Sequence, residues 1–195
     1  MAILAAAALA AALAHPFLLA GPAHAAGGFD LRELLSGMAA VGEVRAEFVE
    51  RKTLAVLDQP LLASGTLRYR RPDFLERITR GPSDERMTVT GDRLTLEWPS
   101  RHTVRTFALS ANPALWATVE AIRATLAGDR AALERFYWTT LSGDERAWTL
   151  RLEPRAAGVT AWVQSILLAG GSRFITRVEV QQANGDRSVM DIRPA

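Results

Sequence analysis

The chain has 195 residues, a nearly balanced formal charge of +2 and no cysteine. The absence of cysteine excludes disulfides, thiol chemistry and zinc–thiolate sites. Its basic side chains are nearly all arginine and alternate with acids, a pattern typical of solvated strand faces that argues against a nucleic-acid partner. The length suits one domain with a sizeable core.

The first 25 residues are expected to be a cleaved signal peptide. Residues 1–26 contain no acidic or basic side chain, and Ala23-His24-Ala25 fits the small-x-small pattern of a signal-peptidase site. A membrane-spanning helix is the alternative, but Pro16 and Pro22 interrupt the apolar run before the roughly 20 residues that a span needs. We therefore predict a periplasmic protein with one domain over residues 26–195.

The mature chain is predicted to begin with a helix over residues 30–42. Asp30 is placed to cap this helix, and its apolar residues recur at helical spacing. From residue 43 to 57 the period changes to two, which predicts a half-buried strand. One side of that strand carries Val44, Ala46 and Phe48.

Residues 61–98 contain four short runs of alternating apolar residues separated by turn signals. The turns are expected at Arg71-Pro72-Asp73, Gly81-Pro82-Ser83 and Gly91-Asp92, because proline cannot donate to a sheet ladder and glycine and aspartate favour turns. The pattern predicts an antiparallel meander. Residues 103–109, apolar on both faces, predict a further strand covered on both sides.

Two helices are expected to interrupt the strands. Asn112-Pro113 combines a capping residue with a proline at the first helical position, and Gly128 suits the end of that helix. Asp129 can cap a second helix that runs through Phe136.

Period two returns in the C-terminal third, where strands are predicted over residues 148–152, 159–168, 174–180 and 188–192. Asn184-Gly185 is a strong hairpin signal before the last of them. The fold class predicted is α+β, with a single strongly curved antiparallel sheet of about ten strands, a half-barrel, and three helices covering its concave apolar face. If the helices fill the curve, the result is an ordinary core. If they form a lid, a lipid-sized cavity remains.

Several motifs resemble the LolA family of periplasmic lipoprotein carriers. They are Phe48-x-Glu50, the stretch Ser64-Gly65-x-Leu67-x-Tyr69-x-Arg71-Pro72, the charged strand near Glu85, and the Gly91-Asp92 turn. With the order of elements, the resemblance covers nearly the whole mature chain. It implies a hydrophobic cavity that takes the acyl chains of a lipoprotein or other lipid as cargo. It also implies an inner-membrane donor protein, an outer-membrane acceptor protein and transient membrane contact, and we expect a monomer.

Arg71 matches the family arginine that, by this resemblance, binds the helical lid and holds the empty carrier closed. A guanidinium has five donors in a planar fork and could hold several lid carbonyls. The alternative is a solvated strand-end charge beside Arg70. The chain stops at Ala195 without the family's extra C-terminal segment, so we expect a divergent, shorter paralogue whose cargo need not be a lipoprotein.

The candidate cavity wall consists of aromatic and aliphatic side chains on the alternating strand faces and on the helix after residue 112. The same stripes would also suit ordinary core packing. The strand candidates are Phe48, Leu67, Tyr69, Phe74, Met87, Val89, Leu94, Leu96, Trp98, Trp148, Leu150, Trp162 and Phe174, and the lid candidates are Leu115, Trp116, Val119 and Ile122.

Nothing in the mature sequence predicts catalysis, a metal site or a cofactor. His102 is its only histidine, so no histidine pair can bind a metal, and no Gly-x-Ser-x-Gly motif is present. The acidic pairs Asp84-Glu85 and Asp144-Glu145 each lie beside an arginine in an expected turn. We therefore predict a non-enzyme. The alternative to a carrier is an envelope interaction protein with a closed core that binds a protein or peptide on its curved sheet.

Overall fold

The computed structural model describes residues 29–81 and 84–195, so the predicted signal peptide and two turn residues, Pro82 and Ser83, lie outside the described residues. In this part of the chain, eleven strands form one antiparallel sheet in the order β6-β5-β4-β3-β2-β1-β11-β10-β9-β8-β7. The strands are β1 (Glu43–Thr53), β2 (Leu61–Arg70), β3 (Phe74–Arg80), β4 (Glu85–Thr90), β5 (Arg93–Trp98), β6 (Thr103–Ala108), β7 (Tyr137–Gly143), β8 (Trp148–Pro154), β9 (Val163–Gly171), β10 (Phe174–Gln182) and β11 (Arg187–Pro194).

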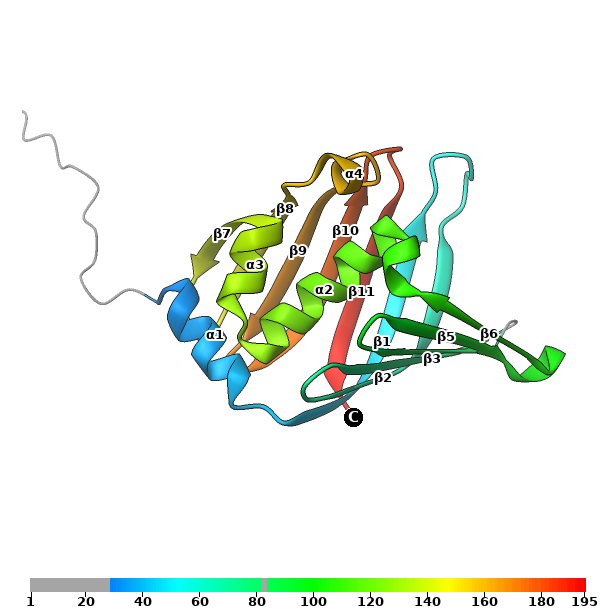
Figure 1. Ribbon diagram of the computed structural model, residues 1–195, viewed down its shortest axis with the longest axis horizontal. Coiled ribbons are helices and arrows are strands. Elements are labelled where there is room, and N and C mark those ends of the chain that lie inside the picture. The colour runs from blue at the N-terminus through cyan, green and yellow to red at the C-terminus, as the bar shows by residue number, and fades with distance from the viewer. Residues whose placement is uncertain (1–28, 82–83) are drawn as a thin grey trace, which may run out of the picture.

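The sheet is open, with β6 and β7 at its edges, and it twists strongly. Figure 1 shows β8 to β11 rising through the molecule while β3, β5 and β6 run across it. At the centre, β11 pairs with β1, and Phe48 lies opposite Ile192. The last strand of the chain therefore joins the two halves of the sheet.

The three predicted helices begin where the capping signals placed them, and one short helix was not predicted. The helices are α1 (Leu31–Ala39), α2 (Pro113–Ala127), α3 (Arg130–Phe136) and the short, unpredicted α4 (Ala157–Thr160), with 3-10 turns η1 (Pro99–Arg101) and η2 (Leu109–Ala111). The side chains of Asp30, Asn112 and Asp129 accept hydrogen bonds from backbone N–H groups in the first turns of α1, α2 and α3 at 2.8, 3.0 and 2.9 Å. Gly128 ends α2 with a positive φ of 71°, as the C-cap pattern predicted.

Helices α1, α2 and α3 lie against one face of the sheet, which we call the covered face (Figure 1). Side chains of α1 and α3 pack with those of β7 to β10 into the main core, where Met38, Leu133, Leu150 and Leu152 are fully buried. A second, smaller cluster lies between α2 and the β4–β5 hairpin. Its members are Val89, Leu94, Leu109 and Val119.

The opposite face of the sheet is polar and carries ion pairs between neighbouring strands. Arg193 on β11 pairs with Glu47 on β1 at 2.7 Å, and Arg177 on β10 pairs with Asp191 on β11 at 3.4 Å. The alternation of arginine with acids in the sequence thus marks a solvated strand face, as predicted. Exposed pairs of this kind contribute little stability individually.

Four details differ from the sequence prediction. Residues 103–109 were predicted as a strand covered on both sides, but β6 lies at the edge of the sheet and its residues 104–108 are exposed, because no helix or further strand in the described part of the chain covers them. Residues 137–143, for which no strand was predicted, form β7 and raise the number of strands to eleven. The first strand ends at Thr53 rather than residue 57, because the chain turns there towards β2. The strand predicted from residue 159 begins instead at Val163, because Val159 lies in α4, which turns the chain between β8 and β9.

Candidate ligand cavity

A cavity of about 570 Å³ lies between α2 and the covered face of the sheet. Its lining comes from β1 to β4, from β9 to β11 and from α2, and most of it is apolar. The volume falls within the range of roughly 300–1,000 Å³ that is typical of small-molecule sites. Helix α2 thus covers an open space, whereas α1 and α3 fill the neighbouring part of the face with an ordinary core.

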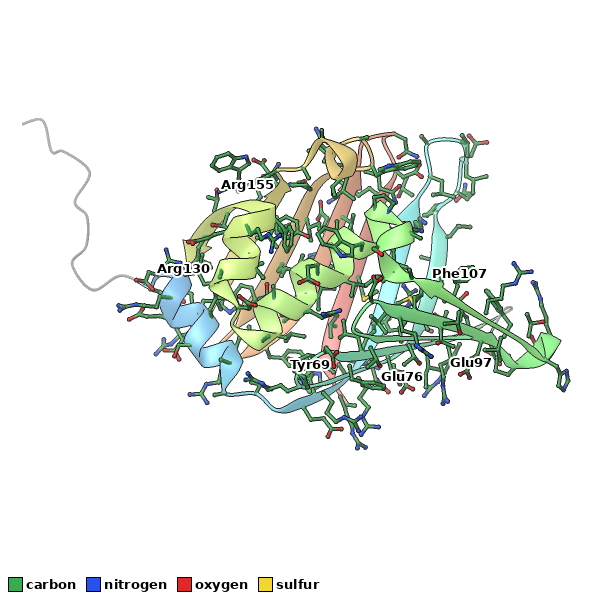
Figure 2. All side chains as sticks on the ribbon, viewed as in Figure 1. Tyr69, Glu76, Glu97, Phe107, Arg130 and Arg155 are labelled. Atoms are coloured by element: carbon green, nitrogen blue, oxygen red, sulfur yellow. The ribbon has the colours of Figure 1, made fainter. Side chains whose placement is uncertain are left out.

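The helical part of the lining has the spacing that the sequence predicted. Leu115, Val119, Ile122 and Leu126 recur along α2 and all line the cavity. Opposite them, Val44 and Ala46 project from β1 and Leu67 and Tyr69 from β2, because alternate residues of a strand share one face. Tyr69 is labelled in Figure 2.

The structure brings eight of the predicted wall residues together around this cavity. They are Leu67, Tyr69, Met87, Leu115, Val119, Ile122, Trp162 and Phe174.

The other predicted wall residues lie elsewhere. Trp148 and Leu150 are fully buried in the main core, and Val89 and Leu94 belong to the smaller cluster. Phe74 lies on the opposite face of the sheet, where the Arg70 guanidinium stacks on its ring at 5.0 Å from the centroid. The remaining four are also outside the lining: Phe48, Leu96, Trp98 and Trp116.

Contacts with neighbouring side chains explain why three of these residues, Phe48, Trp98 and Trp116, lie outside the cavity. The ring of Phe48 lies beside Gly65 and is covered by the Arg77 guanidinium at 4.7 Å from its centroid. Trp98 donates from its indole nitrogen to Glu85 at 3.0 Å, and Trp116 packs edge-on against Phe136 at 5.0 Å. An alternating pattern indicates a strand face, but it does not indicate which part of that face the helices leave empty.

The sequence reasoning missed a group of polar side chains in the lining. The Glu50 carboxylate accepts hydrogen bonds from Arg77 Nη2 at 2.5 Å and from Ser188 Oγ at 2.5 Å, and Lys52 and Gln182 lie in the same lining. The signal was present in β1, because Glu50 and Lys52 continue the series of covered-face positions that begins at Val44.

Two arginines connect helices to the sheet beside the cavity. Arg71 Nη1 donates to the carbonyl oxygen of Ala39, the last residue of α1. Arg123 of α2 donates from Nη1 to the carbonyl oxygen of Gly91, in the β4–β5 turn, at 2.8 Å. Only the first of these contacts involves a residue that the sequence singled out.

Two buried tyrosines differ in their hydrogen bonding. Tyr137 donates from its hydroxyl to the carbonyl oxygen of Ala117 in α2 at 2.6 Å, whereas the buried hydroxyl of Tyr69 has no partner among the described residues. Burial raises the pKa of both hydroxyls, and the charge of Glu120 raises that of Tyr137 further. Both rings are therefore neutral at ordinary pH.

Within residues 29–81 and 84–195, no three histidine or carboxylate side chains gather closely enough to bind a metal ion. No helix in the same ranges is both long and apolar enough to cross a membrane.

The sequence matches the family model described as outer membrane lipoprotein carrier protein LolA-like over residues 20–191. A comparison with curated proteins found no match. Among solved structures, the chain is similar to a LolA superfamily protein from Nitrosomonas europaea, with 14% identity, a TM-score of 0.46, and 84% of this chain and 91% of that chain covered. It is also similar to a DUF1329 family protein from Desulfovibrio piger, with 11% identity, a TM-score of 0.47, and 84% and 89% covered. The family model spans most of the sequence, and the chain therefore belongs to the LolA-like family of outer membrane lipoprotein carrier proteins.

Proposed function

We propose that this protein is a periplasmic carrier that shelters the acyl chains of a lipoprotein or another lipid in the cavity beneath α2. The observation that carries the proposal is the largely apolar 570 Å³ space between a single helix and the sheet. Transfer of acyl chains from water into such a space is favourable by about 0.8 kcal/mol for each methylene group. A chain with many methylenes would therefore remain bound during passage through water.

The family supports a lipid or lipoprotein as the cargo. Its model carries the description of an outer membrane lipoprotein carrier protein LolA-like. The proposed route runs from an inner-membrane donor towards an outer-membrane acceptor. The predicted signal peptide over residues 1–25 and the single carrier domain over residues 26–195 fit that route.

Arg71 is the proposed latch of the helical cover, because it binds α1, whose side chains share the main core with those of α2. Its hydrogen bond to the Ala39 carbonyl connects the end of α1 to the end of β2. Because Arg71 is exposed and a single exposed hydrogen bond contributes little, this contact can be broken at low cost. The empty carrier would thus be closed but easily opened.

A titration with an environment-sensitive fatty-acid probe tests the carrier function. We expect saturable uptake near one probe per chain for the wild type and strongly reduced uptake for Val44→Trp, because Val44 lines the cavity and the larger ring would occupy it. The matched control is Val49→Trp on the same strand, since Val49 projects from the other face and is 57% exposed. Circular dichroism would verify that both variants are folded.

Two outcomes would contradict the proposal. One is the absence of probe uptake by the wild type, which would favour a closed core and the interaction-protein alternative. The other is an equal loss of uptake in both variants, which would place the probe outside the cavity. Mass spectrometry of an organic extract of the purified protein would identify any lipid bound in the cell.

A further inference from the structure

The polarity of the cavity changes from one end to the other. On the covered face, β1 begins with Val44 and Ala46 and ends with Glu50 and Lys52. The neighbouring strand β11 repeats this change in the same direction, because antiparallel pairing places Ser188 opposite Lys52 and Ile192 opposite Phe48. One end of the lining is therefore mostly apolar, with Arg173 as the exception, and the other, which we call the polar end, contains Glu50, Lys52, Arg77, Gln182 and Ser188.

The lining of the polar end contains more positive than negative charge. Glu50 carries one negative charge, and Arg77 and Lys52 carry one positive charge each, so this part of the lining has a net charge of +1. Asp186 lies outside the lining, and the pKa of its carboxyl is lowered mainly by the Ala55 N–H and in smaller part by the charge of Lys52, so it offsets part of the positive charge of Lys52. Glu50 already accepts hydrogen bonds from Arg77 and Ser188. Arg77 also donates from Nε to Thr79 Oγ1 at 3.3 Å, but among the described residues no acceptor is recorded for its Nη1 or for the Lys52 ammonium. The unused donors favour an anionic partner.

These charges are partly withdrawn from water, which strengthens their interaction with a ligand. The side chains of Arg77 and Glu50 are 23% and 13% exposed. Charged groups in such a position cost free energy unless they are paired, and hydrogen bonds between ionised partners are stronger than neutral ones. An anion held here would satisfy donors that the protein itself leaves without partners.

The polar end also lies near the surface. Trp162, which lines the cavity, is 57% exposed, and Leu61, which lies opposite Lys52 in the β1–β2 ladder, is 50% exposed. At the other end, Ala46 and Tyr69 are buried. An amphiphile would thus bind with its chain inward and its head group towards solvent.

The volume of the cavity limits the number of acyl chains that a bound ligand can have. A cavity of 570 Å³ has the size of sites that hold a single drug-sized molecule. This size suits one acyl chain with a small head group better than a lipid with two or three long chains.

We propose that the closed cavity binds a single-chain amphiphile with an anionic head group, a carboxylate or a phosphate, which Arg77 and Lys52 hold at the polar end. This inference rests on the proposed function, because it concerns the same cavity. Two other charged lining residues already have partners: Arg68 pairs with Glu43 at 2.9 Å and Glu76 with Arg86 at 3.6 Å. Arg173 lies beside Gly37 of α1, far from the polar end in the fold, and is the competing site for the head group.

Displacement of the neutral fluorescent probe N-phenyl-1-naphthylamine tests the head-group site. The competitors are dodecanoate, dodecyl phosphate and dodecanol, which share one chain length and differ in the head group. We expect at least one of the two anions to bind about tenfold more tightly than the alcohol, because a charge-assisted hydrogen bond exceeds a neutral one by about this factor. Whichever anion has the advantage identifies the head group as carboxylate or phosphate.

Substitutions at the polar end test whether the anionic head group binds there. Lys52→Gln should reduce the preference for the anion, and the double variant Glu50→Gln/Arg77→Gln should reduce it further, while dodecanol binds as before. The double change removes both partners of the ion pair, so that neither is left unpaired. Arg51→Gln is the matched control, because Arg51 adjoins Lys52 but faces solvent on the other side of the sheet.

The outcomes separate the two proposals. Binding of the probe with equal displacement by all three competitors would overturn the head-group site and leave the carrier function intact. A preference that disappears in Arg173→Gln and persists in Lys52→Gln would also overturn it, because the head group would then lie at the other end. Failure of every ligand and of the probe to bind would overturn the carrier function as well.

Discussion

At the scale of single residues, a comparison of Tyr137 with Tyr69 shows how much the hydroxyl group of a buried tyrosine contributes to stability. Both side chains are nearly fully buried, but only Tyr137 has a hydrogen-bond partner among the described residues, the Ala117 carbonyl in the second turn of α2. Loss of a buried hydrogen bond lowers stability, whereas loss of a hydroxyl without a partner removes a polar group from an apolar environment. Replacement by phenylalanine should therefore lower the stability of the protein at Tyr137 but not at Tyr69.

We expect Tyr137→Phe to lower the free energy of unfolding by about 1 kcal/mol, because the buried hydrogen bond from its hydroxyl to the Ala117 carbonyl is lost. Tyr69→Phe should leave it unchanged or raise it slightly. Urea denaturation of both variants measures the difference. Equal destabilisation would indicate that the Tyr69 hydroxyl has a partner, such as bound water, in solution.

The polar end of the cavity also shows how far single residues could be predicted. Glu50 was visible as part of the Phe48-x-Glu50 motif, but its partners Arg77 and Ser188 are distant in sequence. Ser188 lies 138 positions from Glu50, and only the β1–β11 pairing brings them together. No periodicity within one strand contains that information, because register between strands is a property of the folded sheet.

At the scale of elements, helix caps and tight turns were predicted well because their signals are local. The caps at Asp30, Asn112 and Asp129 and the Asn184-Gly185 turn lie where the sequence placed them. Strand β7 was missed, because it follows α3 directly at Tyr137 without an intervening glycine or proline. Its residues alternate in burial, but the alternation includes threonine and glycine and is weakly apolar.

Gly65 of β2 is an element-scale feature, because it sets how closely β2 and β3 approach. A Cβ atom at this position would lie 1.8 Å from the Ile78 carbonyl oxygen of β3 and 3.0 Å from the Phe48 ring of β1. The first contact is with backbone, so the strands themselves would have to shift. Gly65, which belongs to the stretch that resembles the LolA family, thus allows β1, β2 and β3 to pack closely.

We expect Gly65→Ala to destabilise the fold by about 1–3 kcal/mol, the usual cost of overpacking. Gly42→Ala is the control, because a Cβ there has no atom within 4 Å, and it should be neutral or slightly stabilising through a less flexible unfolded chain. Thermal denaturation would compare the two. A Gly65→Ala protein as stable as the control would show that β2 and β3 separate without cost.

At the scale of the whole molecule, the covered face combines a filled half with a partly empty one. Helices α1 and α3 complete a core with β7 to β10, whereas α2 crosses from that core to the β4–β5 hairpin and leaves the cavity beneath it. The contacts of Arg71 with α1 and of Arg123 with the β4–β5 turn hold this arrangement together. The choice between lid and core could not be made from composition, since both use the same apolar stripes.

If Arg71 is the latch, its removal should favour the loaded carrier over the empty closed one. We expect Arg71→Leu to retain a bound acyl probe more strongly, with release slowed roughly two- to tenfold, as loss of one exposed hydrogen bond allows. Stopped-flow release into acceptor vesicles provides the measurement. Arg70→Leu is the control, because that guanidinium stacks on Phe74 on the opposite face, and unchanged release in Arg71→Leu would argue against the latch.

The central pairing of β1 with β11 also determines when the protein can fold. A ribosome makes β1 well before β11, at about 5–20 residues per second, so β1 lacks one of its two partners until β11 has been made. The sheet is completed only at that point. Until then, one edge of β1 exposes unpaired backbone donors and acceptors, to which a strand of another chain can add.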